Sequence, residues 1–193
     1  MGDARSDDAW ITLLALEAGA GDRTALTTFI RATQRDVYHF LTHLCARDEA
    51  EDLTQETYLR ALRALPSFAG RSSARTWLLS IARRVAADQI RRASARLRTS
   101  AVDDWDAVVA PDSTHHRSGW EEGVLLRELV AALDSDRRDA FVLTQILGLS
   151  YAAAAEVCEC PVGTIRSRVA RAREDLIRAM NSLGWPGRSA TSP

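Results

Sequence analysis

The chain has 193 residues, with 25 basic and 26 acidic side chains, 46% apolar residues and a formal net charge of −1. This composition excludes a collagen-like or mucin-like chain and a strongly acidic disordered one. Because one domain takes about 100–200 residues, we expect one domain or two small ones. All 25 basic residues are arginines, whose guanidinium groups stay charged and bind phosphates and guanine edges through a fixed fork of donors.

The cysteine content and the N-terminus indicate where the protein works. The number of cysteines is odd, and no apolar segment follows Met1, so a secreted disulfide framework is not expected. No run approaches the roughly 18 consecutive apolar residues of a membrane helix, and the N-terminus is acidic, unlike an arginine-rich transit peptide. We therefore expect a cytoplasmic protein. The cysteines are Cys45, Cys158 and Cys160.

Long stretches rich in Ala, Leu, Arg and Glu, with almost no alternation of β-branched residues, predict an all-α fold. The first four helices are expected at about 7–18, 22–44, 48–65 and 73–98. Asp22 and Ser73 are the expected N-caps, and Pro66 ends the third helix. A second set is expected at about 118–133, 135–147, 150–158 and 161–181.

The segment between the two sets, 99–117, has the composition of an acidic flexible linker without helical periodicity. Two small helical domains are therefore expected: a four-helix unit over 1–98 and a helix-turn-helix domain over 118–183, followed by a flexible tail over 184–193. The linker is either a solvated spacer or a segment that occupies a positively charged channel in a partner. Its acidic residues are Asp103, Asp104, Asp106 and Asp112.

The near-zero net charge hides a segregation of charges. Residues 63–98 contain nine arginines and one acid, Asp88, whereas residues 48–56 contain five acids and no base. A second basic block, Arg166 to Arg173, lies in the last helix. Two basic helices on two domains suggest two contacts with one polyanion, although a solvated helix face is the ordinary explanation of such a run.

The helix over 48–65 presents an acidic outer face with an apolar centre, which indicates either a protein-binding surface or a solvated amphipathic helix. Its inner face has Ala50, Leu53, Thr57, Ala61 and Ala64. Its outer face has Asp52, Gln55, Glu56 and Leu59.

The segment 67–73 is a loop of small polar residues and one aromatic residue, and it leads into an arginine-rich helix. Such a loop can hold an unstacked base while the arginines follow a nucleic-acid backbone. Phe68 and Trp77 could instead be ordinary core residues, and for Trp77 we favour the core.

The last two helices are joined by the tight turn Glu159-Cys160-Pro161, which predicts a helix-turn-helix whose second helix enters a major groove. At 100° per residue, one side of the second helix is apolar and packs, and the other side is exposed. The alternative is a helical hairpin that binds nothing. The packing side has Val162, Ile165, Val169, Ala172 and Leu176. The opposite side has Gly163, Thr164, Ser167, Ala170 and Arg171. Ser167 and Arg171 can reach base edges, whereas Thr164, Arg166 and Arg168 are better placed for phosphates.

Three motifs in order carry a family resemblance: EAEDLTQETYLRAL (49–62), SFAGRSSARTWLLSIARRVAADQIRR (67–92) and GLSYAAAAEVCECPVGTIRSRVARAREDL (148–176). On these motifs the chain resembles the extracytoplasmic-function (ECF) sigma factors of bacterial RNA polymerase, and most closely the actinobacterial sigma-C type. The resemblance implies two domains, sigma-2 and sigma-4, that bind core polymerase and recognise the −10 and −35 promoter elements.

The resemblance also implies a role for each set of residues. Asp52, Gln55, Glu56 and Leu59 would contact the core polymerase, on the clamp helices of the β and β′ subunits. The loop 67–73 would capture a flipped −10 base, and the following helix would hold the non-template strand. The residues implied in −10 recognition and melting are Phe68, Arg71, Ser72, Trp77, Arg83, Arg84, Arg91 and Arg92. Those implied in −35 recognition are Thr164, Arg166, Ser167, Arg168 and Arg171. The acidic linker would pass through the polymerase cleft.

The sequence departs from the family pattern at three places. Arg84 stands where the family usually has Asn, which favours backbone attraction over a side-chain contact to a base. Ala153-Ala154 replaces a common Glu-Ile pair. Glu159 replaces the usual turn glycine, so we expect a strained positive φ there.

No catalytic constellation, metal site or cofactor site is expected, and the protein is not expected to be an enzyme. His39 and His43 are four residues apart, His115 and His116 lie in the linker, and Cys158 falls among apolar helix positions as a small buried thiol. The functional alternative is a free-standing helix-turn-helix regulator that does not associate with polymerase. Family members are often held by an anti-sigma factor although some have none, and no residue here decides between these cases.

Overall fold

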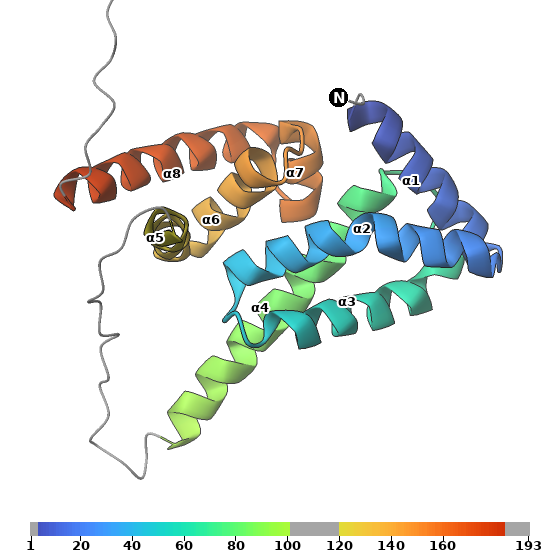
Figure 1. Ribbon diagram of the computed structural model, residues 1–193, viewed down its shortest axis with the longest axis horizontal. Coiled ribbons are helices and arrows are strands. Elements are labelled where there is room, and N and C mark those ends of the chain that lie inside the picture. Colours follow the sequence, from blue (N-terminus) through green and yellow to red (C-terminus); the bar gives the residue numbers. More distant parts are fainter. Residues whose placement is uncertain (1–3, 101–119, 184–193) are drawn as a thin grey trace, which may run out of the picture. The chain divides into compact units, whose positions relative to one another are not determined.

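The computed structural model describes residues 4–100 and 120–183, and the described residues contain helices and no strand (Figure 1). The predicted all-α class is confirmed. The chain separates into two compact units. The first unit contains α1 to α4, and the second contains α5, α6, η2, α8 and most of α7. Most of the predicted linker and the whole predicted tail lie outside the described residues.

The first unit is built on α2, which packs against α1, α3 and α4. Its core includes Phe29, Val37 and Phe40 from α2 and Leu78 and Leu79 from α4, all at most 1% exposed. The elements are α1 (Ala4–Gly19), α2 (Arg23–Leu44), α3 (Ala50–Ala64), the short 3-10 helix η1 (Leu65–Ser67) and α4 (Ala74–Ser100).

Both predicted N-caps of this unit are confirmed. Asp22 Oδ1 accepts hydrogen bonds from the backbone N–H groups of Thr24 at 2.7 Å and Ala25 at 3.0 Å. Ser73 Oγ accepts from the backbone N–H of Thr76 at 3.1 Å. These bonds satisfy donors that have no partner inside the helix, and they place the starts of α2 and α4.

In the second unit, α8 (Val162–Ser182) packs on α6 (Ser135–Phe141). Helix α5 (Trp120–Ala131) also contacts α8. Its core includes Val130, Val142, Leu143, Ile165 and Val169, all at most 1% exposed. The remaining helix, α7 (Tyr151–Cys158), follows Ser150, whose Oγ accepts from the backbone N–H of Ala153 at 3.1 Å.

One predicted α-helix is only partly α-helical. The helix expected over 135–147 is α-helical only to Phe141 and continues as the π-helical segment η2 (Val142–Ile146). Three consecutive side chains of this segment, Val142 to Thr144, are buried. Apolar periodicity cannot reveal this change of winding. In the part of the chain that is described, no helix is long and apolar enough to cross a membrane.

Candidate nucleic-acid and protein interfaces

The outer face of α3 is exposed as the sequence predicts. Asp52, Gln55 and Leu59 are exposed, and Leu59 keeps 51% of its surface. The predicted inner residues are buried, apart from Ala64, which is only half-buried because it lies in the last turn of the helix. An exposed leucine among acidic and amide groups is suited to protein contact, because burying it in an interface is favourable.

Glu56 differs from the other residues predicted for this face. Its Oε1 accepts from Arg60 Nε at 2.7 Å, and Arg60 Nη1 also donates to Asp88 Oδ2 on α4 at 2.7 Å. The hydrogen bond from Arg60 is the main cause that lowers the pKa of Asp88. Glu56 is therefore half-buried and part of a link between α3 and α4, and it is less available to a partner than Asp52.

The loop before α4 is ordered by an aromatic pair. The rings of Phe68 and Trp77 have centroids 4.9 Å apart at an interplanar angle of 40°, and both side chains are half-buried. Phe68 and Trp77 were expected to be either base-binding residues or ordinary core residues. Neither description is complete, because the two rings pack on each other and both side chains stay partly accessible. Gly70 has φ +65°, a conformation that favours glycine. Arg71 is exposed and Ser72 is half-buried.

The predicted arginines of α4 extend from this loop along one side of the helix. Trp77, Arg84 and Arg91 are spaced by seven residues, which places them on one stripe. Both arginines are exposed, and Arg91 also pairs with Asp88 on the same helix. The flanking Arg92 is exposed and Arg83 is half-buried. From Trp77 to Arg91 the stripe covers about 21 Å at a rise of about 1.5 Å per residue. A stripe of positive charge that begins at an aromatic pair suits a single nucleic-acid strand.

The helix-turn-helix of the second unit is present at the predicted residues. The helix α7 ends at Cys158 and α8 begins at Val162, with the three turn residues between them. Glu159 has φ +53°, as expected for a position that usually has glycine. Cys158 is buried, with 6% of its surface exposed, and Cys160 is half-buried; all three cysteines are thiols.

The two faces of α8 are nearly as predicted. Ile165, Val169, Ala172 and Leu176 are buried, whereas Gly163, Ser167, Ala170 and Arg171 are exposed and Thr164 is half-buried. Val162 was expected on the packing side but is 41% exposed. It is the first residue of the helix, and the first buried residue of α8 is Ile165.

Of the two arginines at the edges of the exposed face, only Arg166 is exposed. Arg168 is turned toward its own unit: its guanidinium donates to the carboxylate of Asp136, and its Nη1 lies 3.5 Å from Cys160 Sγ. Only 21% of its side-chain surface is exposed. The structure therefore brings Thr164, Arg166, Ser167 and Arg171 together on one surface, and it uses Arg168 within the fold. Periodicity could not separate the two edge arginines.

Within residues 4–100 and 120–183, no group of three or more His, Cys, Asp or Glu side chains could hold a metal ion. His39 and His43 lie on α2, and both are half-buried. His115 and His116 lie outside the described residues.

Comparison with known proteins assigns the chain to a family. The family model for Sigma-70 region 2 matches residues 29–96, and the model for Sigma-70 region 4 matches residues 123–176. The chain is 53% identical, over 89% of its length and 92% of theirs, to the probable RNA polymerase sigma-C factor of Mycobacterium bovis and to the ECF RNA polymerase sigma factor SigC of Mycobacterium tuberculosis. The chain belongs to the ECF sigma factors. The resemblance stated from the motifs, including its sigma-C type, is confirmed.

A more distant relative and two solved structures agree with this assignment. The ECF RNA polymerase sigma-E factor of Haemophilus influenzae is 34% identical over 84% of this chain and 91% of its own length. The solved structure of the sigma factor RpoE with the anti-sigma factor NepR from Bartonella quintana covers 81% of this chain and 96% of that one, with a TM-score of 0.67 and 27% identity. CnrH in complex with the cytosolic domain of CnrY shares the fold, with a TM-score of 0.70 and 22% identity over 90% of this chain and 98% of that one.

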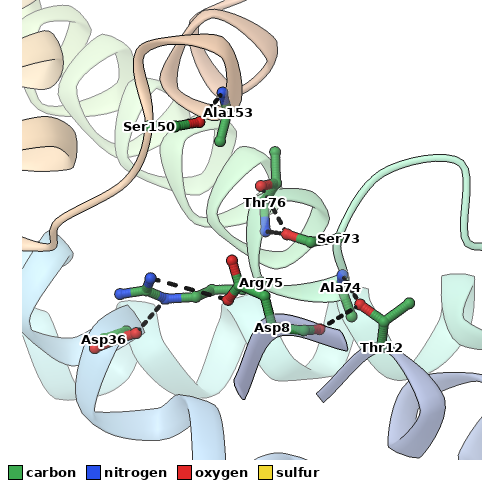
Figure 2. A network of polar contacts seen from close by, with 9 residues as sticks. All are labelled: Asp8, Thr12, Asp36, Ser73, Ala74, Arg75, Thr76, Ser150 and Ala153. Carbon is green, nitrogen blue, oxygen red and sulfur yellow. Dashed lines mark hydrogen bonds and ion pairs between the residues drawn. The ribbon is translucent and has the colours of Figure 1, made fainter. Parts of the chain in front are cut away.

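The residues that sequence reasoning missed in this ECF sigma factor are those that support the interfaces. They include Thr12, Asp36 and Arg75, which join α1, α2 and the start of α4 (Figure 2), and Asp136, the partner of Arg168. Each pair is far apart in sequence, so no local spacing signals it. An arginine in the basic run that faces an acid of another helix looks the same in sequence as one that faces DNA.

Proposed function

We propose that this ECF sigma factor binds core RNA polymerase through the outer face of α3, recognises the −10 element with the loop 67–73 and α4, and recognises the −35 element with α8. DNA-dependent transcription then begins at promoters that carry both elements. The protein supplies binding and strand separation, and it acts in the cytoplasm without catalysing a reaction and without a cofactor.

The observation that carries this proposal is the stripe that runs from Phe68 and Trp77 to Arg84 and Arg91. An aromatic pair beside a glycine-containing loop can stack an extruded base, and the arginines that follow can neutralise successive phosphates. Extruding a base costs a few kcal/mol, which such contacts offset. A free-standing regulator that binds closed duplex has no use for such a surface.

The proposed division of labour follows the two units. Residues 1–98 form the sigma-2 domain, which contacts the β and β′ subunits and the −10 element, and 118–183 form the sigma-4 domain. Residues 99–117 are the acidic linker in the polymerase cleft, and 184–193 are a tail. An anti-sigma factor is a further candidate partner, because two solved proteins of this fold are bound to anti-sigma factor NepR and to the cytosolic domain of CnrY.

Run-off transcription tests the proposal. Core polymerase from the organism that encodes the chain is combined with the purified protein and with fragments of that organism's genomic DNA. We expect a stable complex with core and discrete transcripts that the core alone does not make. If the protein neither binds core nor initiates at any fragment, the proposal is wrong. Binding to duplex DNA without any complex with core would support the free-standing regulator instead.

A further inference from the structure

The helix α1 contacts the segment that connects α3 to α4 at three points on one face. The contacting residues of α1 are 12, 16 and 19, a spacing of four and three that puts them on one side of a helix. Residue 12 contacts residue 74, residue 16 contacts residue 70, and residue 19 contacts residue 65. The proposed base-capturing loop therefore lies along α1. This helix precedes residues 29–96, the part matched by the Sigma-70 region 2 model.

Two of the three contacts involve glycines, and one of them requires a glycine for space. A Cβ atom added to Gly19 would lie 2.7 Å from the carbonyl oxygen of Leu65, so the backbones of α1 and η1 can approach only because Gly19 has no side chain. A Cβ atom added to Gly70 would lie 3.6 Å from a δ-carbon of Leu16, so the leucine covers the backbone of the loop at its left-handed residue.

The third contact is a hydrogen bond that completes the start of α4 (Figure 2). Thr12 Oγ1 accepts from the backbone N–H of Ala74 at 3.0 Å and donates to the carbonyl oxygen of Asp8 at 2.7 Å. Ala74 is the first residue of α4 and is fully buried, and its N–H has no acceptor within its own helix. The bond to Asp8 orients the hydroxyl, so that an oxygen lone pair faces Ala74.

Charged groups fix the same junction. Arg75 Nε donates to Asp36 Oδ2 on α2 at 2.6 Å, and Arg75 Nη1 lies 4.0 Å from Asp8 Oδ1 on α1 (Figure 2). Two helices, α1 and α2, therefore contact the first turn of α4. The loop is held at both ends and at its middle, whereas Arg71 and the partly accessible Phe68 remain available to a ligand.

We propose that α1 holds the loop 67–73 in the conformation that receives the unstacked −10 base, and that Thr12 is a positioning residue for promoter opening. This inference rests on the proposed role of the loop. An ordered loop binds a base without the entropic cost of arranging itself first. Removing the acceptor of Thr12 leaves the buried N–H of Ala74 unsatisfied, which loosens the first turn of α4 and the loop before it.

The test compares holoenzymes assembled from core polymerase and variants of the full chain, on a promoter found by run-off transcription. A fluorescent adenine analogue is placed at each −10 position in turn to report base extrusion, and affinity for core is measured separately. Thr12→Val keeps the shape of the side chain and removes the hydroxyl. We expect its opening equilibrium to fall about tenfold with affinity for core unchanged, and Thr12→Ser to restore opening to within about twofold of the original.

Thr28→Val is the matched control, because Thr28 Oγ1 donates to the carbonyl oxygen of Thr24 within α2 at 2.9 Å, the same type of bond that Thr12 makes to Asp8. Its opening should not change. Equal opening by Thr12→Val and the original chain overturns the inference, and so does an equal loss in both threonine variants. If the original holoenzyme opens no promoter, the proposed role of the loop fails instead.

If Thr12→Val does not fold, a second pair of variants, at Leu16 and Leu13, tests whether α1 positions the loop. Leu16 contacts Gly70, whereas Leu13 lies on the same helix without being part of that contact. Leu16 is 39% exposed and Leu13 is 59% exposed, so shortening either side chain should leave no cavity in the core. We expect Leu16→Ala to reduce base extrusion and Leu13→Ala to leave it unchanged. Identical extrusion in these two variants contradicts the inference.

Discussion

Arg168 on α8 donates a hydrogen bond to the carboxylate of Asp136 on α6, and this pair ties the proposed recognition helix to the helix on which it packs. The same guanidinium approaches the thiol of Cys160 in the turn before α8. The helix that is expected to enter the major groove is thus oriented by a residue of its own basic block. Within that block, Arg168 positions the helix, whereas Arg166 and Arg171 are exposed and are the residues proposed to contact DNA.

Arg168→Ala is expected to destabilise the second unit rather than remove a phosphate contact. Because Asp136 is partly exposed, with 47% of its side-chain surface accessible, the coupling free energy between the two residues should be modest, about 0.5–1 kcal/mol. A double-mutant cycle with Asp136→Ala, followed by urea unfolding of the full chain, measures this coupling. Strictly additive effects of the two substitutions would show that the pair contributes nothing.

Arg171→Ala is expected to weaken binding to the −35 element by about 1–3 kcal/mol and to relax the base preference at one position. Arg166→Ala, by contrast, should weaken binding to all sequences alike and reduce the slope of log affinity against log salt by about one. Both residues are exposed on α8, so the two variants form a matched pair. Titrations of a holoenzyme with consensus and altered −35 duplexes at several salt concentrations distinguish them. An equal loss on every sequence for Arg171→Ala would assign that side chain to a phosphate.

Leu59→Ala is expected to weaken the complex with core polymerase by at least about 1 kcal/mol, roughly fivefold in Kd, because the exposed leucine is the apolar centre of the outer face of α3. Thermal stability should hardly change, since the side chain is 51% exposed in the free protein. Leu13→Ala is the control, because Leu13 is similarly exposed, at 59%, on α1. Fluorescence titration of labelled core measures both. If the two variants bind core equally well, the outer face of α3 is not the contact.

The structural features that depend on local residue spacing could be predicted from the sequence. It predicted the two sets of helices, the caps at Asp22 and Ser73 and the buried side of α8, because capping and periodicity are properties of neighbouring residues. It missed the π-helical winding of Val142–Ile146 and the inward turn of Arg168. Both depend on what packs against the segment from elsewhere in the chain, and a run of residues does not encode its packing partner.

Glu159→Gly is expected to stabilise the folded chain by about 1 kcal/mol. Glu159 has φ +53°, and a left-handed backbone costs a residue with a Cβ atom roughly 1–2 kcal/mol, part of which glycine loses again in the entropy of the unfolded chain. Thermal unfolding of the full chain should show a higher midpoint. Glu156→Gly, inside α7, is the control and should destabilise by about 1 kcal/mol, since its backbone is helical. A lower midpoint for Glu159→Gly would mean that its side chain matters more than its backbone.

The stability of the first unit is expected to fall at alkaline pH because of Tyr58. Burial raises the pKa of Tyr58 to about 12 from the model-peptide value of 10.0, although the hydroxyl of Thr33, 2.7 Å away, opposes the shift in part. The folded chain therefore keeps the phenolic proton at pH values at which the unfolded chain has lost it. The titration of Tyr58 therefore leaves the free energy of unfolding at its full value below pH 10. This free energy falls as the pH rises toward 12, by up to about 1.4 kcal/mol per pH unit.

Tyr58→Phe isolates this effect. The variant lacks the phenol, so its unfolding free energy should not show the decline attributed to Tyr58, and Thr33 keeps its hydrogen bond to the carbonyl oxygen of Phe29 at 2.8 Å. The difference between the tyrosinate absorbance curves of the two proteins should have its midpoint near pH 12. A midpoint near pH 10 would show that the phenol is solvated in the folded protein, and an equal decline in stability for both proteins would place its cause in another group.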